Sequence, residues 1–259
     1  MRQAVPSSST RDADGFPVRG LAQTFRDGHR LDRHTHPWAQ LVYAASGTMK
    51  VSTPDATWLV PPTRAIWAPG GTPHEIEMRG AVAMRTLYLA PARDHPALSA
   101  CRAIEVAPLL RELILHIVRI GMLQADDPGH GRLEALLVDL LAAAETAPLE
   151  LPLPKDARAA GFAERLLAEP GSAALLAELA RGSGASLRTL QRLFLAETGL
   201  SLEAWRGRAR MQQAVVALSA GAPVTEAALD AGYSSASAFI AAFKRAFGVT
   251  PARYRGRAG

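Results

Sequence analysis

Cysteine and long apolar runs are nearly absent from this chain of 259 residues. Its single cysteine, Cys101, cannot form a disulfide within the chain and is typical of a reducing compartment. No apolar run reaches the ~18 residues of a membrane-spanning helix. Residues 1–19 lack the apolar stretch of a signal peptide and are interpreted as a mobile polar tail. These absences favour a cytoplasmic protein that does not enter a membrane.

Positive charge is concentrated in the C-terminal part of the chain. Residues 1–154 carry 15 Lys and Arg against 16 Asp and Glu, whereas residues 155–259 carry 14 against 8. The two parts thus have net charges of −1 and +6, which give the +5 of the whole chain. This asymmetry indicates that the second part meets a polyanion, although a solvated arginine-rich face is the alternative interpretation.

Residues 20–100 have the pattern of a small all-β domain. Short segments rich in Val, Ile, Trp, Tyr and Thr, such as AQLVYA and VAMRTLYLA, alternate with Gly and Pro clusters. Many short strands at regular spacing predict a sandwich or a barrel. Two strongly apolar helices are expected within 101–146, separated by a QADDPGH loop in which Pro128 and Gly129 break the helix. These helices, including Leu109 on the apolar stripe of the first, either pack on the sheet or pair with a second copy in a homodimer.

A linker and a second domain are expected after these helices. Residues 147–156, APLELPLPKD, hold three prolines in ten residues, which disfavours both helix and central strand. Residues 157–259 then follow as a helical domain. The predicted fold class is therefore α+β, with a β-barrel and two helices followed by an all-α domain.

The stretch HTHPWAQLVYAASG at 34–47 places two histidines one residue apart. In a strand His34 and His36 would point to the same face, because side chains alternate with a period of two. The full pattern is Gly28-x5-His34-x-His36-x3-Gln40-x6-Gly47, followed downstream by Pro69-x-Gly71-x2-His74.

This two-part pattern resembles the cupin family of small barrels, in which three histidines and a glutamate hold a divalent metal. The resemblance implies His34, His36 and His74 as metal ligands. The glutamate position holds Gln40, and Thr63 replaces the glycine that usually opens the second motif. Three imidazoles still suffice for Zn, Ni, Cu or Fe, but the lost carboxylate disfavours redox oxygenase chemistry. The alternative is a metal-free barrel whose histidines hydrogen-bond an organic ligand or each other.

A small-molecule pocket in the same barrel is a further hypothesis. Aromatic and amide side chains are suited to line such a pocket, and each has core or rim packing as its alternative role. The candidate effector-binding residues are Trp38, Gln40, Tyr43 and Trp67.

The last hundred residues contain an internal repeat. Residues 175–206 align with 224–255 without a gap, at an offset of 49 residues. Each copy has the pattern of a helix, a turn with glycine, a second helix and then Gly-apolar-Ser/Thr, and the first copy begins with the expected helix AALLAELAR. Ser186 and Ser235 are expected N-caps of the second helices. Two helix-turn-helix units in a basic domain indicate DNA binding.

The segment EAALDAGYSSASAFIAAFKRAFGVTPARYR resembles the signature of the AraC-type transcriptional regulators. The resemblance implies sequence-specific binding to promoter DNA, modulated by a small molecule or metal in a cupin-like N-terminal domain and commonly by dimerisation. RNA polymerase is a further candidate partner. The expected DNA-binding residues are Ser186, Arg188, Thr189, Gln191, Arg192, Ser235, Ser237, Lys244 and Arg245.

The two copies of the repeat differ at the positions expected to read bases. The first copy offers Arg188, Gln191 and Arg192, which suit guanine and adenine, whereas the second offers only Ser237, Ile240 and Ala241. We therefore expect the first copy to dominate base readout, and the second to act through phosphates and DNA shape.

Two functional classes follow from these patterns. The first is a transcriptional regulator that is not an enzyme, and the second is a metal-dependent cupin enzyme tethered to DNA. Gln40 in the glutamate position favours the regulator. A third class, an oligomerising scaffold with a degenerate DNA module, is disfavoured by the intact Arg188, Gln191 and Arg192.

Overall fold

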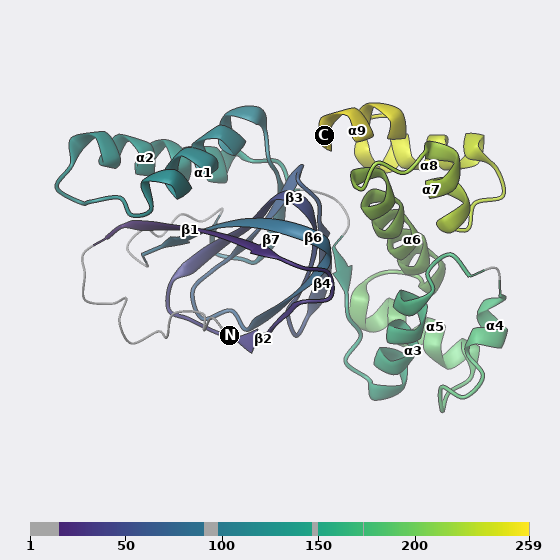
Figure 1. Cartoon of the computed structure of the whole chain (residues 1–259). Coiled ribbons are helices and arrows are strands. Elements are labelled where there is room, and N and C mark those ends of the chain that lie inside the picture. The colour runs from purple at the N-terminus through teal and green to yellow at the C-terminus, as the bar shows by residue number, and fades with distance from the viewer. Residues whose placement is uncertain (1–15, 91–97, 147–149, 173, 259) are drawn as a thin grey trace. The chain divides into compact units, whose positions relative to one another are not determined.

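The computed structural model describes residues 16–90, 98–146, 150–172 and 174–258 (Figure 1). It divides into two compact units, one of Met1–Met49 with Pro62–Ala147 and the other of Lys50–Pro61 with Pro148–Gly259. A sheet domain followed by helices precedes a helical domain, which confirms the predicted α+β class. Residues 1–15 of the expected tail and 147–149 of the expected linker lie outside the described residues. None of the described helices is long and apolar enough to cross a membrane.

The first unit is built on antiparallel strands, of which β1 and the start of β6 alternate between more and less buried residues, whereas β5 is buried throughout. Strand β6 pairs with β1 and with β2, and β5 pairs with β3 and with β7. The bounds are β1 Val18–Phe25, β2 Arg30–His34, β3 Ala39–Ser52, β5 Arg64–Ala68, β6 His74–Leu89 and β7 Arg102–Glu105. The pairing of β2 and β3 with strands far along the chain brings residues near 35 beside residues near 75.

Two helices, α1 (Pro108–Ile120) and α2 (Pro128–Ala143), pack on one face of this sheet (Figure 1). Leu113 and Ile117 of α1 lie in one buried cluster with Leu137 and Leu141 of α2 and with strand residues. Intrachain packing, one of the two alternatives for the apolar stripe, is therefore observed. Leu109 is an exception, since it lies off this stripe with 58% of its side chain exposed.

The expected break between the two helices is observed, but Pro128 and Gly129 belong to α2 and not to the loop. Pro128 is the first residue of α2, and the Asp127 carboxylate caps the helix by accepting hydrogen bonds from the backbone N–H groups of Gly129 and His130. Proline is tolerated there because the first N–H groups of a helix have no intrahelical partner.

The second unit combines the hairpin segment Lys50–Pro61 with the C-terminal helices. Strand β4 (Ala56–Val60) pairs antiparallel with β8 (Leu151–Pro152), so part of the segment expected to be an irregular linker forms a short strand. Proline is compatible with a strand at a sheet edge. The helices are α3 Ala157–Ala168, α4 Leu176–Leu179, α5 Leu187–Thr198, α6 Leu202–Ser219, α7 Val224–Asp230, α8 Ala236–Phe247 and α9 Pro251–Ala258.

The internal repeat appears as two matching helices. Helices α5 and α8 both have 12 residues, and each boundary of α8 lies 49 residues after that of α5. Ser186 and Ser235 cap their N-termini, whereas Gly199 and Gly248 end them with a φ of 70° that favours glycine. Helix α4 is much shorter than the expected AALLAELAR, since it begins only at Leu176, and its N-cap residue Leu175 has no side chain that could cap it.

Candidate functional site

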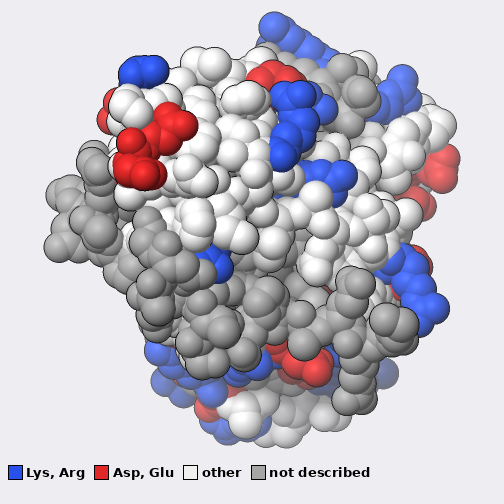
Figure 2. Space-filling model, turned by 60° about the vertical axis from the view of Figure 1, so that its left-hand side comes forward, with Lys and Arg blue, Asp and Glu red and all other residues white. Residues whose placement is uncertain are grey.

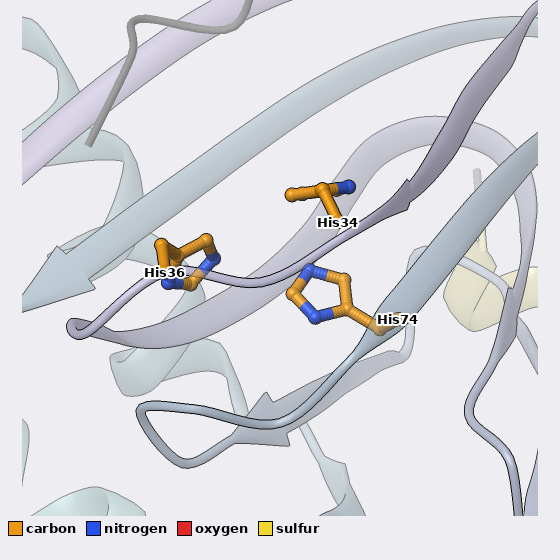
Figure 3. A group of neighbouring side chains, drawn as sticks. All are labelled: His34, His36 and His74. Atoms are coloured by element: carbon orange, nitrogen blue, oxygen red, sulfur yellow. The ribbon is translucent and has the colours of Figure 1, made fainter.

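The three histidines of the two-part motif come together in the first unit (Figure 3). His34 ends β2 and lies directly opposite His74, the first residue of β6. His36 follows in the connection to β3, so only His34 of the first pair lies in a strand. The ring centroids of His34 and His74 are 4.5 Å apart, and those of His36 and His74 are 5.3 Å apart. One ring nitrogen from each histidine lies within 4.8 Å of the others.

Close packing of two loops positions His36 beside His74. The backbone N–H of Gly71 donates to the carbonyl of His36 at 2.8 Å. At Gly70 a Cβ atom would lie 2.1 Å from the carbonyl oxygen of Pro37, so only glycine allows this approach. The two glycines of the second motif thus place the start of β6 against the residues around His36.

Gln40 connects two of the histidines to strand β6. Its side-chain oxygen Oε1 lies 3.0 Å from Nε2 of His36 and 2.9 Å from Nε2 of His74. Its nitrogen Nε2 donates to Oγ1 of Thr86 at 2.9 Å and to the hydroxyl of Tyr88 at 3.1 Å. Gln40 and Thr86 are almost completely buried, as is His74. Thr86 was missed in the sequence, because only the cross-strand register brings it to Gln40.

In each histidine, the ring nitrogen Nδ1 is hydrogen-bonded to a backbone carbonyl oxygen. The partners are Asp32 O at 2.8 Å for His34, Trp38 O at 2.6 Å for His36 and Thr72 O at 2.8 Å for His74. A carbonyl only accepts, so Nδ1 carries the hydrogen in all three rings. The Nε2 atom of each neutral ring therefore carries a lone pair. Histidines that bind metals almost always donate their other ring N–H in this way.

Around Gln40, hydrogen-bond acceptor atoms of the amide and of two histidine rings face one another. The hydroxyl of Thr86 donates to Leu41 O at 3.0 Å, so Oγ1 of Thr86 must accept from the amide nitrogen of Gln40. The amide oxygen then faces the Nε2 lone pairs of His36 and His74. A positive species between these atoms, either a proton on a ring or a metal ion, would remove the repulsion, as would a Gln40 amide turned by about 180°, which donates its N–H groups to the two rings.

Protonation of His74 is disfavoured. The pKa of His74 is lowered to about 4, mainly by burial and also by the positive charges that His34 and His36 would carry, while the hydrogen bond to Thr72 opposes the shift. At neutral pH the ring is therefore neutral and offers Nε2 as a ligand atom. Three imidazole nitrogens and one amide oxygen form a set that fits a divalent transition metal.

Tyr43 and Trp67, two of the other candidate effector-binding residues, pack elsewhere in the first unit. Tyr43 and Trp67 belong to the buried cluster that packs against α1 and α2, and the indole N–H of Trp67 donates to Leu98 O at 2.7 Å. Trp38 is buried, with the Arg19 guanidinium 5.3 Å from the centre of its ring. Gln40 is the candidate whose side chain hydrogen-bonds His36 and His74, and Trp38 contacts His36 through its backbone carbonyl.

In the second unit, α5 presents the residues expected to read bases. Arg188, Gln191 and Arg192 are exposed, whereas Leu190 and Phe194 are buried in the first helical core. The hydroxyl of Ser186 accepts from the backbone N–H of Thr189 at 3.2 Å and lies 3.0 Å from its Oγ1. The two hydroxyls therefore order the first turn of α5, which is the part of a reading helix that meets base edges.

Helix α8 presents a different surface at the equivalent positions. Ser237, Ile240 and Ala241 are exposed, and Ile240 leaves 37% of its side chain accessible. Lys244 and Arg245 are exposed in the last turn, while Ser235 accepts from the backbone N–H of Ala238 at 3.2 Å. Apart from Ser237, the exposed part of α8 is therefore apolar in its first two turns, and it is basic at its end.

Two protein-family models match this chain, and the first extends through α3 into the second unit. Residues 16–169 match the family described as AraC-like ligand binding domain, and residues 179–257 match a helix-turn-helix domain family. The HTH-type transcriptional regulator NimR of Escherichia coli K12 is 32% identical over 224 residues, covering 86% of this chain and 82% of NimR. RipA of Corynebacterium glutamicum is 35% identical over 103 residues, covering 40% of this chain and 31% of RipA.

Among solved structures, ToxT of Vibrio cholerae O395 aligns with 93% of this chain and 97% of its own, at 9% identity and a TM-score of 0.40. The matched relatives are transcriptional regulators, so the tethered-enzyme alternative has no support from them. The ligand-binding match spans more than half of the chain, and the similarity to NimR extends through both units. This protein belongs to the AraC-type family of DNA-binding transcriptional regulators, with an N-terminal ligand-binding domain and a C-terminal helix-turn-helix domain.

Proposed function

We propose that this regulator binds promoter DNA under the control of a divalent transition metal held by His34, His36, His74 and Gln40. The observation that carries the proposal is the common orientation of the rings. All three Nδ1 atoms donate to backbone carbonyls, which leaves Nε2 as the ligand atom of each neutral ring. The oxygen of Gln40 lies against two of these nitrogens and supplies a fourth ligand atom.

The ligand set narrows the choice of metal. It contains neutral imidazoles and a neutral amide, which suit Zn, Ni, Cu or Fe better than Ca or Mg. No carboxylate belongs to it, so the two-histidine, one-carboxylate arrangement of redox oxygenases is not formed by these residues. A structural or sensory metal is thus favoured over a catalytic one.

We propose that α5 reads bases and that α8 supplies mainly backbone and apolar contacts. Arg188 and Arg192 are suited to guanine and Gln191 to adenine, because their side chains can form two parallel hydrogen bonds with these bases. On α8, Ile240 suits the methyl group of thymine, while Lys244 and Arg245 suit phosphates. Ser237 adds one short hydroxyl, and Ser186, Thr189 and Ser235 order the first turns of the two helices.

A second copy of the chain is proposed as the partner of the α1–α2 surface. Leu109, Met122 and Leu136 are large apolar side chains with 58%, 46% and 39% of their surface exposed. Figure 2, turned so that the α1–α2 side of Figure 1 comes forward, shows broad described areas without charged side chains between scattered basic and acidic groups.

RNA polymerase is a second proposed partner, and the proposed location is the cytoplasm, where promoter DNA is accessible.

The test measures metal content and DNA affinity on the same samples. Protein is purified without an affinity tag, and DNA bound by the wild type is selected from a random library. Metal content and affinity are then compared for the wild type and His34→Ala/His74→Ala, with and without chelator. His116→Ala, at an exposed position of α1, is the matched control.

Near-stoichiometric metal in the wild type and control, lost in the double variant and accompanied by a chelator-dependent change in DNA affinity, would support the proposal. Metal with no effect on DNA binding would reject the sensory role. If no sample contained metal, the metal proposal would be rejected, and the three histidines would be assigned to a pocket for an organic ligand.

A further inference from the structure

The helical domain contains two separate hydrophobic cores. One holds Phe162, Phe194, Trp205 and Ala209, and the other holds Met211, Val215, Phe239 and Phe243. Both cores include one part of α6, and they divide along that helix between Ala209 and Met211. Helix α5 belongs to the first core and α8 to the second. The separation of the two reading helices therefore depends on what fixes the two cores relative to each other.

Two arginines on one face of α6 bind the segment that follows α3. Arg210 donates from Nε to Pro170 O at 3.1 Å and from its terminal nitrogen to Ser172 O at 3.3 Å. Arg206, one turn earlier, donates to Ser172 O and, at 3.3 Å, to Ala174 O. Arg206 is only 9% exposed, and burial lowers its pKa. The partners identified for these two guanidinium groups are thus backbone carbonyls of one segment.

The same segment touches the turn that precedes α8. A Cβ atom on Gly171 would lie 1.9 Å from the carbonyl oxygen of Asp230, and one on Gly232 would lie 2.5 Å from Gly171 O. Neither backbone could approach the other with a side chain present. Gly232 also has a φ of 73°, so the turn itself requires glycine. The segment around Gly171 therefore lies between α6 and the turn from α7 to α8.

We propose that Arg206, Arg210 and the Gly171–Gly232 contact form a clamp that fixes the distance and angle between α5 and α8. These arginines are positioning residues, which act on DNA readout by holding the two reading helices rather than by touching bases. The clamp makes the protein selective for the spacing of its two half-sites. This inference rests on the proposed reading of DNA by α5 and α8. The inference goes further by naming the residues that set the spacing between the two half-sites.

The clamp is first tested without DNA. Spin labels are placed at Leu195→Cys on α5 and Lys244→Cys on α8, which are equivalent exposed positions of the repeat, in a Cys101→Ser background. The full chain should show one narrow distance distribution. Arg206→Met/Arg210→Met keeps most of the buried volume and should broaden or shift it. Arg208→Met is the control, because Arg208 donates to Glu150 O and not to the clamped segment.

The second test uses DNA selected by the wild type, with base pairs inserted between the two protected regions. One inserted base pair moves the second half-site by about 3.4 Å and about 35° around the duplex. The wild type and Arg208→Met should lose about tenfold or more in affinity per insertion, and the double variant much less. Arg210→Lys, which keeps a single donor nitrogen, should lie between them and replaces the double variant if that variant does not fold.

The outcomes separate this inference from the proposed function. Unchanged label distances together with unchanged spacing dependence in a folded variant would overturn the clamp, whatever Arg188 does. Wild-type binding by Arg188→Ala would instead overturn the reading role of α5, while the label distances would still report on the clamp.

Discussion

The side-chain oxygen of Gln40 lies 2.9 Å from Nε2 of His74, and both groups act as hydrogen-bond acceptors when His74 is neutral. A metal ion between the two atoms would satisfy both lone pairs, whereas a Gln40 amide turned by about 180° would satisfy that of His74 by donating an N–H group. The histidine site therefore has a definite electrostatic requirement, which its variants should reveal.

Gln40→Glu should increase the affinity for a divalent metal. The change adds a negative charge at the atom that faces His36 and His74, without changing the length of the side chain. We expect metal affinity to rise by about tenfold or more, equivalent to about 1.4 kcal/mol. Competition with a chelator of known affinity measures the change. Gln40→Leu, which removes the oxygen, should weaken binding, and equal affinities for all three proteins would exclude Gln40 as a ligand.

The metal-free protein should lose stability as the pH falls from 7 towards 4.5. The folded pKa of His74 is about 4, below its ordinary value of 6.5, so the unfolded chain takes up a proton in this range while the folded protein does not. Proton uptake by the unfolded state favours unfolding, and this group accounts for a loss of about 2 kcal/mol. Urea unfolding in the presence of chelator measures the effect. His74→Gln should show a smaller loss over the same range, and an identical loss would contradict the assignment.

Arg188→Ala and Arg192→Ala should each weaken binding to the selected site by about 1–3 kcal/mol, because a bidentate contact with a base is lost. Binding to scrambled DNA should change much less. Lys244→Ala provides the contrast, since a phosphate contact contributes alike to all sequences and its loss should flatten the salt dependence. Titrations of both DNAs at several salt concentrations measure these effects, and a sequence-selective loss for Lys244→Ala would contradict the division of roles.

Ser186→Ala and Ser235→Ala should each destabilise the protein by about 1 kcal/mol, because each removes the side chain that caps a reading helix. Ser237→Ala is a suitable control, because Ser237 is exposed one residue inside α8 and does not cap it. Thermal or urea unfolding measures the differences. Equal stability of the capping and control variants would show that these caps contribute little.

Leu109→Glu should shift the protein towards monomer if a second copy covers the α1–α2 surface. The side chain is 58% exposed, so the change costs little within one chain but places a charge in the proposed interface. Sedimentation velocity over a range of concentrations measures the effect, with His116→Ala as the control on the same helix. An unchanged dimer, or a wild type that is monomeric throughout, would reject this surface as the interface.

Local signals in the sequence predicted several features well. The serine caps and the glycines at the helix ends recur at an offset of 49, and they define the bounds of α5 and α8. Motif spacing indicated three histidines that the sheet register then brought together. Both signals lie in residues that are close in sequence or belong to a recognisable pattern.

Other features depend on long-range packing and were missed. Gln40 and Tyr43 are separated by three positions on β3, so they lie on opposite faces, and that parity could have excluded Tyr43 from the site. Trp67 pairs across the sheet with Leu41, which is next to Gln40 on β3. Its side chain lies in the same buried core as that of Tyr43. Thr86 carries no local signal at all, because only its strand partner gives it a role.

The unequal surfaces of the two repeat copies have a consequence for the promoter. In the proposed division of roles, α5 with Gln191 and two arginines would specify several bases, whereas α8 with Ile240 and alanines would tolerate many sequences. The recognised DNA should therefore carry most of its information at one end and a degenerate, thymine-rich element at the other. Such a site has a polarity, so each bound chain would point in one direction along the promoter.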